Sequence, residues 1–279
     1  MRPSVTNVDV INPLKNKLAT PDLLAVEEPL QIKLGFGDVN NRQKMDLAVT
    51  MRTPGHDIEL TAGFLISEGI VSSDSDILHI EHCKKGLKKT EIGNVVRVEL
   101  NEGVDFNQEK FQRNFSSTSS CGICGISSIE SVRKQVQHQF RFDSTIDYEV
   151  INSLPDKLNN HQVAYNHTGA IHAAALFDLN GEISLCREDI GRHNAMDKVI
   201  GAAFFKGQHQ LNDKVLFLSG RVGFELVQKA VMSGVPMVAA VGAPSSLAVE
   251  LAKDTGMTLL GFVREGSFNI YCGEKRIRF

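Results

Sequence analysis

Apolar and polar residues alternate in two segments near the start of the chain. The first is Leu30-Gln31-Ile32-Lys33-Leu34, and the second covers residues 45–49, with the turn-forming residues 35–41 between them. A period of two places every second side chain on the same face of a strand. The two segments therefore predict a hairpin of half-buried strands.

A packed helix and two further strands complete this part of the sequence. Apolar residues are frequent in 58–66, directly after the chain-breaking pair Pro54-Gly55, which predicts a helix. Residues 74–80 and 95–100 predict short strands. We expect these elements to form a small α+β unit.

From residue 169 onward, buried strands alternate with helices. The small apolar residues 169–177 predict a strand, and a turn at Asn180-Gly181 returns the chain along 182–186. A repeating strand–helix pattern follows, with strands at 215–218, 237–241 and 258–263 and helices at 224–232 and 247–253. This alternation predicts an α/β fold with a largely parallel sheet and helices on its faces.

These patterns divide the chain into three parts. Residues 1–22 are polar and hold three of the eight prolines, so we expect a loose N-terminal arm. Residues 23–115 form the small α+β domain. Residues 116–279 form the α/β domain.

Composition and charge restrict the class of protein. The chain has 279 residues, 42% of them hydrophobic and 23% charged, as in soluble globular proteins. Its net charge of −3 argues against a general nucleic-acid or membrane surface. We find no segment that spans a bilayer and no signal peptide. Five cysteines, an odd number, favour the reducing cytoplasm over a disulfide framework.

Two cysteines form a C-x-x-C motif, Cys121 and Cys124, within the stretch SSTSSCGICGISS of residues 116–128. Glycine and serine let the backbone bend and leave both sulfurs accessible to a large partner. Apolar residues at helical spacing between Ile129 and Phe140 predict a helix directly afterwards. Its N-terminus would favour a thiolate, which is the nucleophilic form of cysteine. The motif therefore predicts a loop that presents a reactive thiol.

A C-x-x-C motif serves several chemistries. A four-cysteine zinc site needs a second pair, whereas Cys83, Cys186 and Cys272 are isolated in the sequence. A thioredoxin-type redox pair needs a buried strand before it, and residues 114–120 are too polar for one. A sulfur relay through a persulfide and a loop without chemistry are the other two interpretations.

A zinc deaminase signature is present only in part. It combines H-x-E with P-C-x-x-C, and His79-Ile80-Glu81 supplies the first half. Ser120 stands where the proline belongs, and residues 77–80 predict a strand where the signature needs the start of a helix. We therefore do not favour zinc chemistry.

Polar loops follow the predicted strands of the α/β domain. They are Ser219-Gly220-Arg221, residues 242–246 and residues 264–266. Ligands of such sheets bind beyond the carboxyl ends of the strands, and helix N-termini there suit phosphate. Helix-capping loops without a ligand explain each of them equally well.

The densest polar segment is Arg187 to Asn194, which follows a strand and runs into a predicted helix. Its arginine, histidine, aspartate and asparagine side chains within eight residues are typical of a site, although a solvated face has similar composition. From this segment we include Arg192, His193 and Asn194 among the candidate site residues.

Several motifs together resemble one known family. They are SSCGICG, TGAIHAAALFD, REDIGRHNAMDKVIG, APSSLAVELAK, TLLGFVR and MRTPGHDIELTAGFLISEG. From about residue 26 to its end, the sequence is similar to the FdhD family of formate dehydrogenase accessory sulfurtransferases. The resemblance implies a cytidine-deaminase-like three-layer α/β/α domain without zinc chemistry, beside the smaller N-terminal α+β domain.

The resemblance also implies a function. Members of the family are cytoplasmic sulfur carriers that receive a persulfide from a cysteine desulfurase and pass the sulfur to the bis(molybdopterin guanine dinucleotide) molybdenum cofactor of formate dehydrogenase. Cys121 matches the position that bears the persulfide, and Cys124 matches its companion. Guanine nucleotides such as GDP would mimic the cofactor, and the protein would hold no metal of its own.

The predicted cofactor-binding residues come from the family's motif and from the loops described above. They are Phe262, Val263, Arg264, Glu265, Gly266, Ser267, Ser219, Gly220, Arg221, Arg192, His193 and Asn194. The sequence departs from the family's pattern at Ala170, where many relatives have glycine, and at residues 265–267, which are less basic than usual. The phosphate contact would therefore depend mainly on Arg264.

We interpret the sequence as that of a sulfurtransferase and expect a homodimer, with no nucleic-acid or membrane partner. Three alternatives stay open. They are a chaperone that binds the cofactor without transferring sulfur, a C-x-x-C dithiol oxidoreductase, and a zinc hydrolase.

Overall fold

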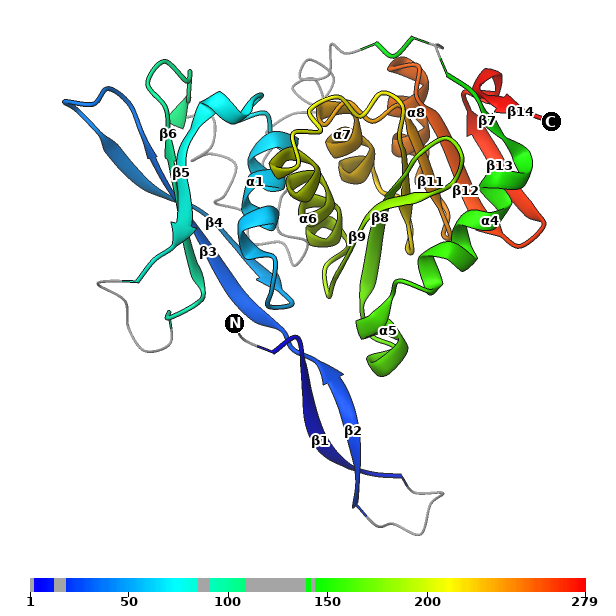
Figure 1. Cartoon of the computed structure of the whole chain (residues 1–279), viewed down its shortest axis with the longest axis horizontal. Coiled ribbons are helices and arrows are strands. Elements are labelled where there is room, and N and C mark those ends of the chain that lie inside the picture. Colours follow the sequence, from blue (N-terminus) through cyan, green and yellow to red (C-terminus); the bar gives the residue numbers. More distant parts are fainter. Residues whose placement is uncertain (1–2, 13–18, 85–90, 109–138, 142–143) are drawn as a thin grey trace.

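A computed structural model describes residues 3–12, 19–84, 91–108, 139–141 and 144–279. Figure 1 shows a four-stranded sheet with one helix at the left and a six-stranded sheet with helices on both faces at the right. A two-stranded ribbon extends away from both. The predicted domain boundary at 115/116 lies outside the described residues.

The four-stranded sheet has the order β4-β3-β6-β5. The predicted hairpin is confirmed, because β3 (Glu28–Phe36) and β4 (Gln43–Arg52) pair antiparallel, while β6 (Val95–Leu100) runs parallel to β3. Helix α1 (Asp57–Ser67) confirms the predicted helix and packs on alternate residues of β3 and β6. The sequence pattern is therefore sufficient for most of this domain.

The predicted strand at 74–80 begins later than expected. Residues Asp74–Asp76 form a short 3-10 turn, and β5 (Ile77–His82) starts after it. The backbone N–H groups of Ser72 and Ser73 donate to the carboxylate of Asp76 at 2.6 and 2.9 Å. This local capping competes with the extended backbone of a strand.

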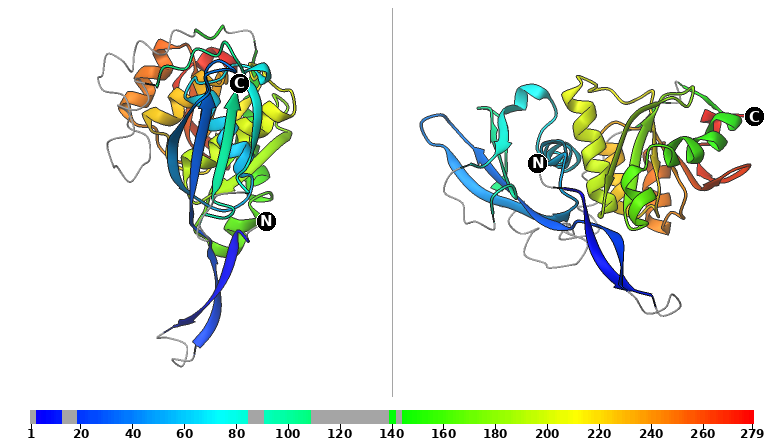
Figure 2. Two further views of the ribbon diagram at one scale, coloured as in Figure 1. Left: turned by 90° about the vertical axis from the view of Figure 1, so that its left-hand side faces the viewer. Right: turned by 60° about the horizontal axis from the view of Figure 1, so that its bottom comes forward.

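The prediction of a loose N-terminal arm is wrong for the described part of it. Strands β1 (Val5–Ile11) and β2 (Ala19–Ala25) pair antiparallel along their whole length. In both views of Figure 2 this ribbon extends away from the rest of the chain. Pro21 suggested a loop, but a proline is tolerated on an edge strand, and both strands of a two-stranded ribbon are edges.

The six-stranded sheet has the order β13-β12-β11-β10-β8-β9. Its strands are β8 (His172–Phe177), β9 (Ile183–Asp189), β10 (Val215–Leu218), β11 (Met237–Ala240), β12 (Thr258–Arg264) and β13 (Ser267–Cys272). The predicted strands β10, β11 and β12 pair parallel, which is confirmed, and β9 points in the same direction because β9 and β10 both pair antiparallel with β8. The sheet as a whole is mixed rather than largely parallel, because β8 and β13 run in the opposite direction. Short turns join β8 to β9 and β12 to β13, and a short turn can connect only antiparallel neighbours.

Helices cover both faces of this sheet, which gives the three predicted layers. On one face lie α6 (Arg192–Phe205), α7 (Phe224–Met232) and α8 (Ser246–Asp254), and on the other lies α4 (Tyr148–Asn159). The short elements α5 (Val163–Thr168), β7 (Ile146–Asp147), Glu274–Arg276 and β14 (Ile277–Arg278) complete the chain. A specific relation to cytidine deaminase stays a prediction.

Helix α4 was not among the helices predicted from the sequence. Its buried residues Ile151, Leu154 and Leu158 have helical spacing, and Pro155 lies within the helix. The periodicity was thus present in the sequence but masked by the proline and the polar residues around it.

Helices α1 and α6 cross at very short range and join the two sheets into one body (Figure 1). A Cβ atom on Gly63 would lie 1.8 Å from the carbonyl oxygen of Asp197, and one on Gly201 would lie 1.8 Å from that of Glu59. Glycine at both positions lets the backbones touch. Nearby, Lys229 Nζ lies 3.1 Å from Asp197 Oδ2 within the same buried region.

Candidate functional site

The carboxyl ends of β10, β11 and β12 meet at one edge of the large sheet, because these strands are parallel. The N–H of Gly242 donates to the carbonyl oxygen of Gly220, and that of Phe262 donates to Gly242, both at 3.2 Å. A Cβ on Gly242 would lie 2.8 Å from backbone atoms of Arg221, so only glycine fits there. This strand-end edge confirms that the predicted loops lie side by side.

The antiparallel strands bring further residues to the same edge. The Ser219 N–H donates to Ala173 at 3.0 Å, which places the start of β8 beside the end of β10. His172 in turn pairs with Asp189 at the end of β9. The polar segment before α6 therefore reaches the strand-end edge as well, because β9 runs in the same direction as β10 and also ends there.

His172 is a candidate site residue that the sequence analysis missed. Its half-buried ring lies against Gly220, where an added Cβ would be 3.2 Å from His172 Nδ1. Burial first, and then the charges of Arg192 and His193, lower its pKa, while Asp189 has the opposite effect. The imidazole is therefore neutral near pH 7. The available signal was a lone histidine at the start of a strand of small apolar residues.

A buried ion pair fixes the backbone beneath this edge. Lys198 Nζ lies 2.7 Å from Asp189 Oδ2, and both side chains are inaccessible to solvent. Asp189 also accepts the N–H groups of Gly191 at 2.8 Å and Thr53 at 3.1 Å, and Lys198 donates to the Thr53 carbonyl at 2.9 Å. The pair thus joins the end of β4 to the start of α6. Removing either partner would leave a buried charge without compensation.

The three candidates at the start of α6 have different environments. Both amide N–H groups of Asn194 are used, at 2.7 Å to Met51 O and at 3.1 Å to Asp189 Oδ1. Its side chain is buried and holds the two domains together, so it has no free donor for a ligand. His193 Nε2 lies 3.0 Å from Glu225 Oε2 at the start of α7. Arg192 and His193 stay predicted contacts of a ligand.

The segment from Phe262 to Ser267 extends beyond the end of β11. Phe262 has a left-handed backbone, with φ 54°, and its side chain is 39% exposed next to Gly242. This conformation is strained for a residue with a side chain, and such strain is concentrated at functional sites. Arg264 pairs with Ser267 across the tip of the β12–β13 hairpin. Arg264 is exposed at this tip, so a large anionic ligand could reach its guanidinium group.

The two helices that begin at this edge differ as phosphate sites. In α8 the Ser245 hydroxyl accepts the Ala248 N–H at 3.2 Å and so satisfies one of the free donors. Helix α7 begins after Gly223, which provides no side-chain cap. In α7 the Leu226 N–H donates instead to the Gly223 carbonyl oxygen at 3.2 Å, so the third donor is satisfied in both helices, and Glu225 in the first turn of α7 opposes an anion.

The predicted nucleophiles Cys121 and Cys124, and the predicted helix after them, lie outside the described residues. The three described cysteines, Cys83, Cys186 and Cys272, are free thiols. Burial raises the pKa of Cys186 to about 12 and also raises that of Cys272. A thiol with a raised pKa is a poor nucleophile at neutral pH. These two cysteines are therefore unsuited to carry sulfur.

The half signature of a zinc deaminase lies on a strand, as predicted. His79 and Glu81 both belong to β5, and their side chains are about half exposed. Across the ranges that the structure describes, we find no group of three or more histidine, cysteine or acidic side chains arranged to hold a metal. In the same ranges no helix is long and apolar enough to cross a membrane.

The fold and the strand-end edge define a mixed α/β protein with a polar site beyond the ends of three parallel strands. The solved structure of a protein from Desulfotalea psychrophila, described as a formate dehydrogenase accessory protein, is similar with a TM-score of 0.70. It covers 98% of both chains at 23% identity, which shows a shared fold.

Sequence comparison gives the family. The chain belongs to the FdhD/NarQ family, whose sequence model matches residues 25–278. It is 46% identical to the sulfur carrier protein FdhD of Streptomyces avermitilis over 92% of this chain and 89% of that protein. It is 42% identical to the protein of the same name from Picrophilus torridus over 99% and 100%. The resemblance found from the motifs is therefore confirmed.

Proposed function

We propose that this protein is a sulfurtransferase that carries persulfide sulfur from a cysteine desulfurase to the molybdenum cofactor of a formate dehydrogenase. The observation that carries the proposal is the C-x-x-C motif within the part of the chain that matches the family. Relatives named sulfur carriers align with more than nine-tenths of the chain. The raised pKa of Cys186 and Cys272 supports the same choice of nucleophile.

The proposed chemistry has two steps, the loading of Cys121 and the release of its outer sulfur. In the first, the Cys121 thiolate attacks the outer sulfur of the donor's persulfide, and the donor cysteine leaves as a thiolate. In the second, the Cys124 thiolate attacks the inner sulfur of the Cys121 persulfide, which releases the outer sulfur as sulfide to the acceptor. This step leaves a Cys121–Cys124 disulfide. A cellular dithiol, or two thiols, then reduces this disulfide, is itself oxidised to a disulfide, and restores both cysteines.

The acceptor in this proposal is the bis(molybdopterin guanine dinucleotide) cofactor, bound as a substrate at the strand-end edge. Several features of the edge support an anionic, aromatic ligand. Arg221 supplies positive charge two residues before Gly223, at the start of α7, and the exposed Arg264 supplies it at the tip of the β12–β13 hairpin. Phe262 supplies an exposed ring for stacking. The neutral imidazole of His172, which lies against Gly220, supplies a hydrogen-bonding group at this edge.

The compartment and the assembly are also proposals. We propose the reducing cytoplasm, because the chain has an odd number of cysteines and its described ones are free thiols. We propose a homodimer, which sedimentation of the purified protein would test.

Formate dehydrogenase activity tests the function directly. Extracts of a strain that lacks its own carrier should gain activity from the wild-type protein, but not from Cys121→Ala. Cys124→Ala should give reduced activity. A chaperone that only binds the cofactor would support activity without Cys121, and that result would refute sulfur transfer. Cys186→Ala is the matched control and should behave as wild type.

A further inference from the structure

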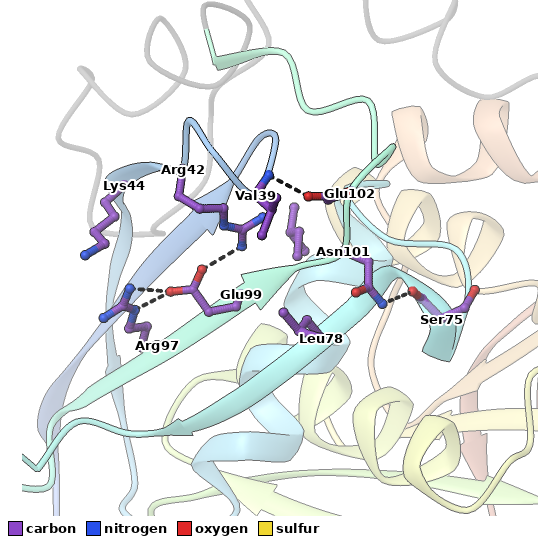
Figure 3. A pocket seen from close by; sticks show the side chains of 10 residues that line it. Val39, Arg42, Lys44, Ser75, Leu78, Arg97, Glu99, Asn101 and Glu102 are labelled. Carbon is purple, nitrogen blue, oxygen red and sulfur yellow. Dashed lines mark hydrogen bonds and ion pairs between the residues drawn. The ribbon is translucent and has the colours of Figure 1, made fainter.

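A pocket of about 950 Å³ lies on the four-stranded sheet. Its lining residues all come from positions 39–102, so it shares no residue with the strand-end edge. Figure 3 shows it between the β3–β4 hairpin and the strands β5 and β6. Val96 and Val98 of β6 pack in one core with α1, so the alternating residues Arg97 and Glu99 face the other side of the sheet. The pocket is therefore on the face that α1 leaves uncovered.

One carboxylate holds two arginines at this pocket. Arg42 Nη2 lies 2.6 Å from Glu99 Oε2, and Arg97 Nε donates to Glu99 Oε1 at 2.5 Å (Figure 3). A Cβ on Gly35 would lie 2.0 Å from the Glu99 carboxylate, so glycine is needed to make room for it. Burial raises the pKa of Glu99, but Arg42 and Arg97 outweigh burial and lower it. Glu99 is therefore ionised and keeps both guanidinium groups in place.

The cluster has an excess of positive charge. The charged side chains that line the pocket are three cations, Arg42, Lys44 and Arg97, and two carboxylates, Glu99 and Glu102, which leaves one net positive charge. Of the two carboxylates, Glu99 holds the arginines and Glu102 accepts the Val39 N–H. Because the arginines are already ordered, an incoming anion loses little side-chain entropy on binding them. The pocket therefore suits a carboxylate.

Exposed apolar side chains lie beside these charges. Val39 is 68% exposed and Leu78 is 64% exposed. Leu78 lies at an irregularity of β5, where Ile77 pairs with Leu100 and His79 with Glu99, so Leu78 has no partner in the ladder. A bulge of this kind turns an extra side chain out of the regular pattern. The result is a leucine beside two pre-ordered arginines.

We propose that this pocket binds an acidic segment of a partner protein, in which a leucine-sized apolar side chain lies next to carboxylates. The carboxylates would contact Arg97 and Lys44, and the apolar side chain would cover Leu78. A nucleic acid fits less well, because its phosphates would leave the two exposed apolar residues, Val39 and Leu78, uncovered. This interaction surface involves no sulfur chemistry, so its failure would leave the proposed function untouched.

Fluorescence anisotropy with the full-length protein tests the proposal. The probes are dye-labelled octapeptides of alternating glutamate and leucine, of alternating lysine and leucine, and of glutamate alone. We expect saturable binding of the glutamate–leucine peptide only, weakened by added salt. Lys44→Glu should weaken it by about tenfold or more, since repulsion replaces attraction. Leu78→Ser should weaken it as well, and Lys253→Glu on α8 should not.

Three results would overturn the proposal. They are equal binding of the lysine–leucine peptide, equal binding of the all-glutamate peptide, and unchanged affinity of Lys44→Glu. Sedimentation gives a fourth: if Lys44→Glu converts a dimer into a monomer, the occupant is a second copy of this chain. The melting temperature of each variant should equal that of the wild type, because the three substituted side chains, at positions 44, 78 and 253, are exposed.

Discussion

Gly63→Ala adds only one methyl group, but we expect it to destabilise the protein strongly. The added Cβ would lie 1.8 Å from the Asp197 carbonyl oxygen and 2.9 Å from the Gly201 nitrogen, and neither backbone atom can rotate away. Helices α1 and α6 must therefore separate by about 1 Å, which disturbs the cores on both sides. Overpacking of this kind costs about 1–3 kcal/mol or more, and the gain of about 1 kcal/mol in helix propensity offsets part of it.

A clash with fixed backbone atoms puts the cost at the upper end of this range, so we expect a net loss of about 2 kcal/mol and a fall of roughly 5 °C in melting temperature for a chain of this size. Thermal and urea unfolding followed by circular dichroism measure it. Gly223→Ala is the matched control, because a Cβ there meets nothing within 4 Å. The double variant with Gly201→Ala should cost less than the sum of the two single changes, since the helices have already separated. A melting temperature of Gly63→Ala equal to that of the control would refute the close crossing.

Two further predictions concern charge. Arg264→Ala should weaken GDP binding by about tenfold or more in calorimetric titration, and Arg264→Lys should recover only part of it, because lysine lacks the bidentate geometry; equal affinities would remove this segment from the site. Burial would raise the pKa of Glu59, but Arg187, at 2.6 and 2.8 Å, and His56 lower it to about 2. A lowered folded-state pKa stabilises the protein above the unfolded value, so this contribution should be lost as pH falls from about 5 to about 2. Melting temperatures of Glu59→Gln should lack that part of the acid dependence, and an identical pH profile would contradict it.

The sequence was sufficient where a single pattern determines a structure. Alternation predicted the β3–β4 hairpin, and buried strands followed by helices predicted α7 with its observed bounds. The turn at Asn180-Gly181 likewise predicted the β8–β9 hairpin, and the structure confirms it. The antiparallel pairing of β8 with β10 and of β12 with β13 was not predictable in this way, because a strand with two buried faces has the same composition in either direction.

The candidate site was predictable to a similar degree. Loops after parallel strands predicted the strand-end edge, because that rule depends only on topology. Residue polarity alone did not identify ligand contacts. Asn194 was predicted as one because it is polar, but its amide donates a hydrogen bond to the Met51 carbonyl oxygen in the other domain. His172 shows the converse: its position at the edge follows from antiparallel pairing, which no local pattern reveals.

The central claim is that Cys121 carries transferable sulfur, and intact mass spectrometry tests it most directly. The purified protein is incubated with a cysteine desulfurase and cysteine, and its mass is measured before and after addition of a reducing thiol. We predict a gain of one sulfur atom on the wild type, localised to Cys121 by peptide mapping, removed by the thiol and absent from Cys121→Ala. A wild-type chain that gains no sulfur, or a Cys121→Ala chain that gains as much as the wild type, would contradict the account.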